Sequence, residues 1–176
     1  MLKNKQKGFT LLELLVVIGI IGLLASIIVV NLTGARRRAR DTKRIADLRT
    51  MQTAAEDYYG KNGAYPTTIQ GMVTGGQLPL WPLDPLAPSG TTCTGNSNLC
   101  YYYAYYTPAG ALGPQSYHFG ASLEDNGSVV LNQDRDCVST TGTSCPYASA
   151  YTNGFNGADT VDCAGAAGRY CYDSAQ

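Results

Sequence analysis

The feature that most constrains this chain is an apolar run at residues 9–32 that contains a single charge, Glu13. A helix rises about 1.5 Å per residue, so these 24 residues are long enough to cross a hydrocarbon core about 30 Å thick. A secretory signal peptide would have a shorter apolar core and then small residues at a cleavage site, a pattern that is missing here. We therefore expect one membrane-spanning helix, in which a carboxylate is costly and marks a function.

The residues around this charge carry a family resemblance. The stretch at residues 7–13, Lys-Gly-Phe-Thr-Leu-Leu-Glu, resembles the leader and N-terminus of type IV pilins and of the major pseudopilins of type II secretion. The resemblance implies that a prepilin peptidase cleaves after Gly8 and methylates the new N-terminus at Phe9, and that Glu13 acts in filament assembly. It also implies the partners: identical subunits in a helical filament, a pilus or secretion platform protein and an assembly ATPase. A plain signal anchor is the alternative interpretation.

Beyond the apolar run, spacing and composition predict an α+β fold. Apolar residues that recur at three- and four-residue steps predict that the helix continues as an amphipathic shaft. One stripe of this shaft is expected to be buried on a globular head, which residues 62–176 form. Aromatic and β-branched residues predict antiparallel strands at residues 100–107, 116–123 and 128–132. The predicted stripe consists of Ala35, Ala39, Thr42, Ile45, Leu48, Gln52, Ala55 and Tyr59.

These patterns divide the chain into six segments. A prepilin leader at residues 1–8 is followed by the transmembrane and assembly stem of the helix at 9–34 and by its amphipathic half at 35–60. A connecting loop at 61–99 leads to the antiparallel β-sheet at 100–132. The last segment, 133–176, is loop-rich, and we expect disulfide bonds to hold its shape.

All six cysteines of the chain lie in the head. An even number of cysteines in a small exported domain indicates disulfides, and six cysteines allow 15 pairings. Separations of seven and eight residues favour pairing of sequence neighbours, each bond closing one loop. Zinc is the rival interpretation, although the chain has no Cys-x-x-Cys and one histidine. The expected pairs are Cys93 with Cys100, Cys137 with Cys145, and Cys163 with Cys171.

The C-terminal segment also offers oxygen ligands of the kind that calcium prefers. These ligands lie in two stretches, residues 134–136 and 153–162, and neither stretch fits an EF-hand loop. Ordinary turn chemistry predicts the same residue types. The resemblance adds weight to calcium, because major pseudopilins bind it in this region, but a protein without any cofactor is the simpler expectation. The candidate ligands are Asp134, Asp136, Asn156, Asp159 and Asp162.

Neither catalysis nor nucleic-acid binding is expected. His118 is the one histidine, and the chain has no Gly-x-Ser-x-Gly motif and no phosphate-binding loop. The arginine-rich stretch at residues 36–44 follows the predicted membrane helix, where lipid head groups, wall polymers or filament pairing explain it better than nucleic acid does.

Charge is distributed unevenly along the chain. Residues 36–61 carry eight Lys or Arg against four Asp or Glu, whereas residues 62–176 carry two against eight. Such opposite fields favour packing of a head on a neighbour's shaft, although solvated faces would give the same pattern. Counting positive charges beside the helix would place the head in the cytoplasm. The cysteines and the leader instead predict a single pass through the cytoplasmic membrane with the head outside, before assembly into an extracellular or periplasmic filament.

Taken together, these features predict a structural subunit of a type IV pilus-like filament that serves adhesion, motility or DNA uptake. We favour a pilin because residues 81–85, Trp-Pro-Leu-Asp-Pro, lack the Trp-Gly-Asn-Pro continuation of the pseudopilin loop. Two alternatives stay open. One is a major pseudopilin of a type II secretion system, and the other is a single-pass anchored module that binds a surface ligand without forming a filament.

Overall fold

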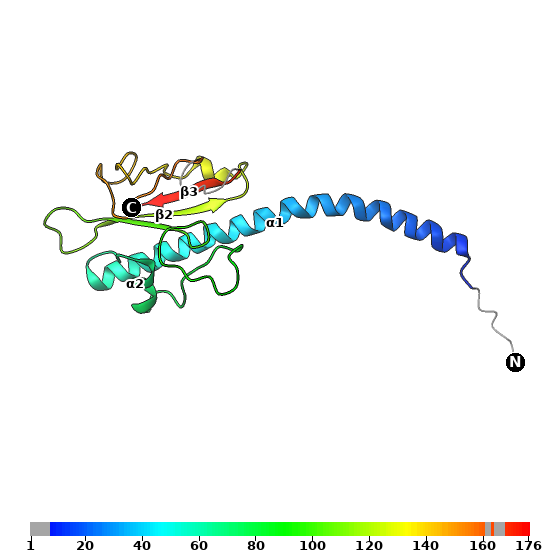
Figure 1. Cartoon of the computed structure of the whole chain (residues 1–176), viewed down its shortest axis with the longest axis horizontal. Helices are drawn as coiled ribbons and strands as arrows, with labels where there is room; N and C mark the ends of the chain where they lie inside the picture. The colour runs from blue at the N-terminus through cyan, green and yellow to red at the C-terminus, as the bar shows by residue number, and fades with distance from the viewer. Residues whose placement is uncertain (1–7, 161–162, 164–167) are drawn as a thin grey trace. The chain divides into compact units, whose positions relative to one another are not determined.

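The computed structural model describes residues 8–160, 163 and 168–176, without the side chains of residues 27–31. It separates into two compact units, Met1–Arg37 and Arg38–Gln176. The predicted long helix is present as α1, Leu11–Asn62 (Figure 1). Gly63 follows it with a φ of 70°, a conformation that ends helices and that glycine adopts without strain.

No helix in the described part of the chain is both long and apolar enough to count as a membrane span. The single membrane pass therefore stays a prediction.

The second unit contains the predicted antiparallel sheet. Its order is β1-β2-β3, with β1 at Tyr102–Tyr106, β2 at Ser116–Leu123 and β3 at Tyr170–Ala175. The central strand β2 is buried along its whole length, since side chains alternate between two covered faces. One face packs on α1 and the other on the C-terminal loops. The α+β class is thus confirmed.

The third strand is not where the sequence predicted it. Residues 128–132 were expected to form a strand, but Val129–Asn132 form a 3₁₀ helix, η1. Both edges of β2 are occupied, one by β1 and the other by β3 from the C-terminal segment, which was expected to be loop. Val129 and Val130 have strand propensity but find no free edge on β2, so sheet pairing overrides local preference.

The buried face of α1 is rotated from the predicted stripe. Ala39 and Thr42 are exposed, whereas Asp41 and Arg44 are 3% and 0% exposed. The predicted stripe left out charged residues because they were expected to face solvent. Asp41 and Arg44 are instead buried in the head, where they form an ion pair. Farther along, the helix packs as expected for an apolar core: Leu48, Met51, Ala54 and Ala55 contact a set that includes Tyr103, Tyr117 and Phe119.

The connecting loop is fixed to the head by a short helix and an indole. Helix α2 spans Ile69–Thr74, and Thr68 caps it by accepting a hydrogen bond from the N–H of Gly71. Trp81 donates its indole N–H to the carbonyl of Cys100.

Three disulfides join the cysteines in sequence order: Cys93 with Cys100, Cys137 with Cys145, and Cys163 with Cys171. No free cysteine is found among the described residues, so the structure offers zinc no thiolate ligand there.

Candidate functional site

The start of α1 contains a reciprocal pair of hydrogen bonds between Thr10 and Glu13. Oε2 of Glu13 accepts from the backbone N–H of Thr10 at 2.8 Å and from its hydroxyl at 2.9 Å, while the N–H of Glu13 donates to the hydroxyl oxygen at 3.2 Å. This arrangement is a capping box, which satisfies backbone donors at a helix start. Its sequence signal is Thr-x-x-Glu at residues 10–13, and the cap was not predicted from it. Glu13 therefore has a partner within its own subunit.

Gly8 and Phe9 precede α1 and are exposed, so the bond predicted to be cleaved lies on accessible, non-helical chain. The helix that follows exposes large apolar side chains: Leu11 is 88% exposed and Leu12 is 74% exposed. The same holds for Leu14, Leu15, Val16, Val17, Ile18, Ile20, Ile21, Leu23 and Leu24. A contiguous apolar surface of this size marks contact with lipid or with other proteins.

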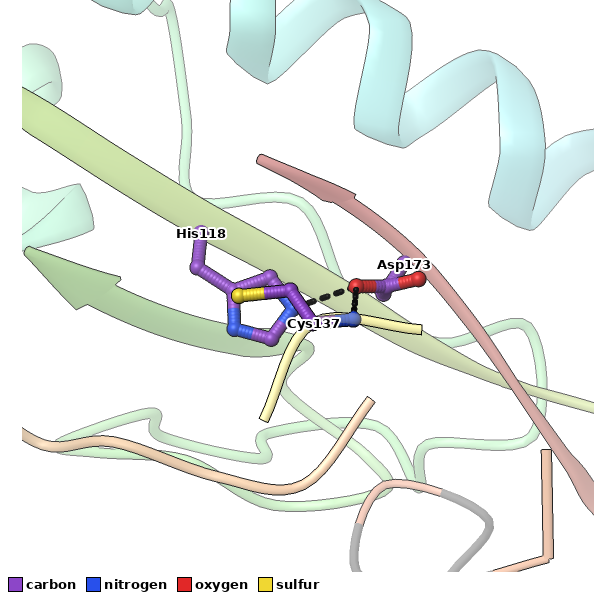
Figure 2. A group of neighbouring side chains, drawn as sticks. All are labelled: His118, Cys137 and Asp173. Atoms are coloured by element: carbon purple, nitrogen blue, oxygen red, sulfur yellow. Dashed lines mark hydrogen bonds and ion pairs between the residues drawn. The ribbon is translucent and has the colours of Figure 1, made fainter. Parts of the chain in front are cut away.

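His118 lies inside the head and bonds to Asp173. In Figure 2 its imidazole, carried on β2, points at the carboxylate of Asp173 on β3. Nε2 of His118 lies 2.7 Å from Oδ2 of Asp173, and Nδ1 lies 2.8 Å from the hydroxyl of Ser139. Burial lowers the pKa of His118 against the opposing effect of Asp173. Because an ionised carboxylate only accepts hydrogen bonds, we assign the imidazole proton to Nε2.

These three residue types are those of a nucleophilic triad, but the arrangement is closed to a substrate. His118 and Ser139 are 0% exposed and Asp173 is 1% exposed. The Ser139 hydroxyl is also engaged with the backbone N–H and carbonyl of Phe155. The imidazole stacks on the Phe155 ring at a centroid distance of 3.9 Å. The group therefore acts as a polar clamp between the sheet and the C-terminal loops. Cys137, drawn beside it, is in a disulfide and is no metal ligand.

Three aspartates of the C-terminal segment, Asp134, Asp136 and Asp159, form an acidic group. Asp134, Asp136 and Asp159 each place one carboxylate oxygen within 4.8 Å of the others. Ligands about 2.3 to 2.6 Å from one calcium ion are separated by distances of this size. The buried Oδ1 atoms of Asp134 and Asp159 have no hydrogen-bond partner. Burial, followed by the charge of Asp173, raises the pKa of Asp134 to about 7. Uncompensated acidic oxygens of this kind fit a divalent cation.

Two calcium candidates remain, Asn156 and Asp162. The side-chain oxygen of Asn156 accepts the N–H of Ala158 in a local turn. Asp162 lies outside the described residues.

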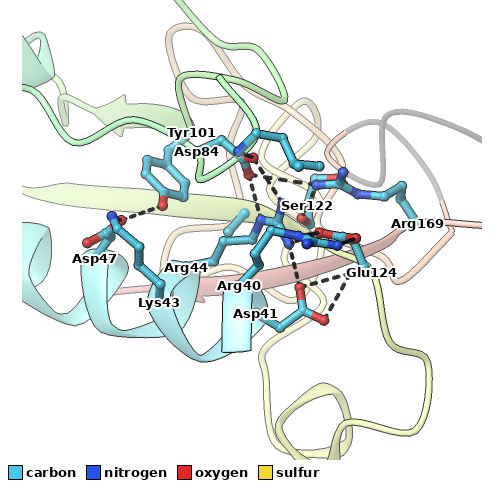
Figure 3. A network of polar contacts seen from close by, with 12 residues as sticks. Arg40, Asp41, Lys43, Arg44, Asp47, Asp84, Tyr101, Ser122, Glu124 and Arg169 are labelled. Carbon is cyan, nitrogen blue, oxygen red and sulfur yellow. Dashed lines mark hydrogen bonds and ion pairs between the residues drawn. The ribbon is translucent and has the colours of Figure 1, made fainter. Parts of the chain in front are cut away.

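A network of buried charges joins the shaft to the head, and it was not predicted from the sequence. Figure 3 shows the Arg44 guanidinium between Asp84 and Asp41. Arg44 donates to Asp84 at 2.5 and 2.9 Å and to Asp41 at 2.6 Å. It also donates to Glu124 at 2.7 Å, while Arg40 contacts the same carboxylate. These ion pairs link α1, the connecting loop and the end of β2.

The network corrects the assignment of the arginine-rich stretch. Arg40 and Arg44 were assigned to lipid, polymers or filament contacts, but both turn inward to acidic residues of the head. Arg169 approaches Asp84 at 3.7 Å from the C-terminal segment. Three guanidinium groups thus meet three carboxylates, those of Asp41, Asp84 and Glu124, so the buried cluster is neutral in total. A buried charge is tolerable only when it is paired in this way.

The network predicts an acid-sensitive contribution to stability. The hydrogen bond from Arg40, with further contacts from Arg44, lowers the pKa of Glu124 from 4.5 to about 2. A lowered pKa means that the ionised carboxylate stabilises the folded state above pH 4.5 and that this contribution is lost as the pH falls toward 2. Urea unfolding of wild type and Glu124→Gln should therefore differ most above pH 5 and converge near pH 2. A difference that is independent of pH would contradict this account.

Comparison with known proteins places these features in a family. Residues 3–29 match the prokaryotic N-terminal methylation motif, a prepilin-type motif of the pilin and pseudopilin class. The chain is 45% identical over 84 residues to the type II secretion system core protein G of Escherichia coli, which covers 48% of this chain and 57% of that protein. It is 46% identical over 72 residues to core protein G of Aeromonas hydrophila, covering 41% and 50%. The chain thus spans about half the length of these two relatives.

A longer match extends into the head. The chain is 32% identical over 142 residues to the type II secretion system core protein G of Pseudomonas aeruginosa, which covers 73% of this chain and 92% of that protein. The chain belongs to the type II secretion system core protein G family. No solved structure is significantly similar to it.

Proposed function

We propose that this protein is the major pseudopilin of a type II secretion system, a structural subunit rather than an enzyme. The observation that carries the proposal is the match to 92% of a core protein G, which extends beyond the helix into the head. This choice reverses the preference for a type IV pilin, which depended on a few residues of the connecting loop. The exposed apolar helix start and the buried polar clamp support a structural role.

In the proposed mechanism, cleavage after Gly8 creates a charged α-amino group at Phe9. The apolar stem waits in the cytoplasmic membrane with the head outside, and it then packs among other stems in a helical filament. Glu13 of one subunit bonds to the Phe9 amine of its neighbour, which places a partner of opposite charge beside a carboxylate that the apolar surroundings disfavour. A head-to-tail contact that does not close produces a filament.

The proposed partners follow from this mechanism. A prepilin peptidase removes the leader, identical subunits form the filament, and a secretion platform protein and an assembly ATPase drive its growth. None of these steps requires a nucleic acid.

We also propose calcium as the ligand of Asp134, Asp136 and Asp159. The ion would supply the positive charge that these carboxylates lack and would tie residues 134–136 to residue 159. A ligand that binds only the folded protein stabilises it by about 2.7 kcal/mol at 100 times its dissociation constant. Calcium should therefore raise the thermal midpoint of wild type but not of Asp159→Asn, with magnesium as the control ion. An equal rise in the variant would refute the site.

Deleting the gene in its own host tests the secretion proposal. We expect proteins that normally reach the medium to accumulate in the cell, and a plasmid copy of the gene should restore their release. Normal secretion together with lost surface fibres, motility or DNA uptake would instead show a type IV pilin. Normal secretion with intact fibres would favour the anchored binding module.

A further inference from the structure

The carboxylate of Asp173 lies at the centre of the loop that carries the acidic group. Its Oδ1 accepts the backbone N–H groups of Arg135 at 3.0 Å and Asp136 at 2.9 Å, and its Oδ2 accepts that of Cys137 at 2.9 Å. Three successive N–H groups that converge in this way form an anion-binding nest, which here is filled by the protein's own carboxylate. His118 donates to Oδ2 from the other side.

The nest holds the loop in a conformation that it would not favour alone. Asp136 has a φ of 49°, in the left-handed region that side chains other than glycine seldom adopt. The backbone N–H of Asp173 also donates to Oδ2 of Asp134 at 3.3 Å. On the opposite side, the N–H of Cys171 donates to the carbonyl of Asp159 at 2.9 Å. Strand β3 therefore contacts both Asp134 and Asp159, which lie in different loops.

The carboxylate of Asp173 is closely packed against Gly157. The N–H of Gly157 bonds to the carbonyl of Cys137 at 2.8 Å. A Cβ at Gly157 would lie 2.5 Å from Oδ2 of Asp173 and 2.7 Å from that carbonyl. Glycine is thus required here by close approach, and the carboxylate is held between the loop and β2.

We infer that Asp173 is a positioning residue: it binds no cation itself but fixes the backbone of residues 135–137, so that Asp134 and Asp136 face Asp159 before calcium arrives. The inference rests on the proposed calcium site. Partners that orient metal ligands commonly change affinity about 10- to 100-fold when they are removed. The loss of Asp173 should therefore weaken calcium binding even though none of the three candidate ligands is changed.

The test uses the full-length protein in detergent micelles, freed of calcium with a chelator. Calorimetric titration with calcium chloride measures affinity, and hydrogen exchange measures protection of the amides at 135–137 in the calcium-free state. Asp173→Asn removes the charge and puts an amide N–H₂ against a backbone donor. Gly157→Ala puts a Cβ against both the Asp173 carboxylate and the Cys137 carbonyl, so it disturbs their contact without removing any charge, and it keeps the test open if Asp173→Asn does not fold.

Asp41→Asn is the matched control, because Asp41 is also a buried carboxylate that accepts two loop N–H groups, those of Glu124 and Asp125. It lies in the charge network of Figure 3 and outside the acidic group. It should lower the thermal midpoint but leave calcium affinity within about twofold, since effects at sites without shared partners are independent.

We expect Asp173→Asn and Gly157→Ala to weaken calcium binding at least roughly tenfold and to speed exchange at 135–137. If Asp173→Asn weakened calcium binding only by removing a negative charge, the loss of affinity would shrink in high salt, and Gly157→Ala would bind calcium with wild-type affinity. Wild-type affinity in folded Asp173→Asn would overturn the inference, as would equal weakening in Asp41→Asn. If wild type binds no calcium, the calcium proposal fails, and unchanged exchange in Asp173→Asn would then overturn the positioning role separately.

Discussion

Glu13→Ala should leave the protein in the membrane fraction and remove it from the filaments that shearing releases. The carboxylate is the single charge of the apolar stem, and the proposed amine at Phe9 is its partner in the neighbouring subunit. Removing one member of a buried ion pair costs about 3 to 5 kcal/mol, because the other charge is left unpaired. At about 1.4 kcal/mol per factor of ten, each subunit contact would weaken at least 100-fold. Immunoblots of sheared and membrane fractions measure the outcome.

Thr10→Val separates the two roles that the structure gives Glu13. This variant keeps the carboxylate and removes the hydroxyl that bonds to it at the helix start. Loss of such a cap costs about 1 kcal/mol, so filaments should form in reduced amount. Normal filaments from Glu13→Ala would refute the docking role, and equal loss in both variants would show that the cap, and not the charge, matters.

Arg44→Met should destabilise the head by about 3 to 5 kcal/mol, because it leaves Asp84, Asp41 and Glu124 buried without their shared cation. Methionine fills part of the space but donates no hydrogen bond. Trp81, the one tryptophan, lies in the same connecting loop as Asp84, so its fluorescence during urea unfolding reports on this region.

Arg38→Met is the matched control for this change. Arg38 pairs with Asp125, but its side chain is 77% exposed, whereas that of Arg44 is 0% exposed. An exposed pair contributes about 0 to 1 kcal/mol. Arg44→Lys should fall between the two, since one ammonium group cannot reproduce the bidentate contact with Asp84. If Arg44→Met unfolds at the same urea concentration as Arg38→Met, the network does not stabilise the head.

Local patterns predicted the parts of the fold that local forces determine. The apolar run and its three- and four-residue steps predicted α1, and aromatic alternation predicted β1 and β2. In β2, Tyr117 and Phe119 reach the core against α1 while His118 faces the C-terminal loops, as the two-residue period requires. The prepilin-type N-terminus could likewise be recognised from residues 7–13, because its motif is contiguous in the sequence.

Long-range pairing was missed. Strand β3 lies in a segment rich in small polar residues, and its partner β2 is about 50 residues earlier in the chain, so no local signal marked it. Arg44 and Asp84 are 40 residues apart, and each alone looks solvent-facing. Asp173 was not a candidate site residue, because its importance comes from the backbone groups of a distant loop and not from a motif. The excess of basic residues at 36–61 and of acidic residues at 62–176 was the one available hint.

The central claim is that this chain is processed as a prepilin-type subunit and built into filaments, and the N-terminal peptide of the protein in sheared filaments tests it most directly. Mass spectrometry should find a peptide that begins at Phe9 and carries one methyl group on its α-amino nitrogen, and the leader at 1–8 should be missing. A peptide that begins at Met1, or at any residue beyond Phe9, would contradict the account.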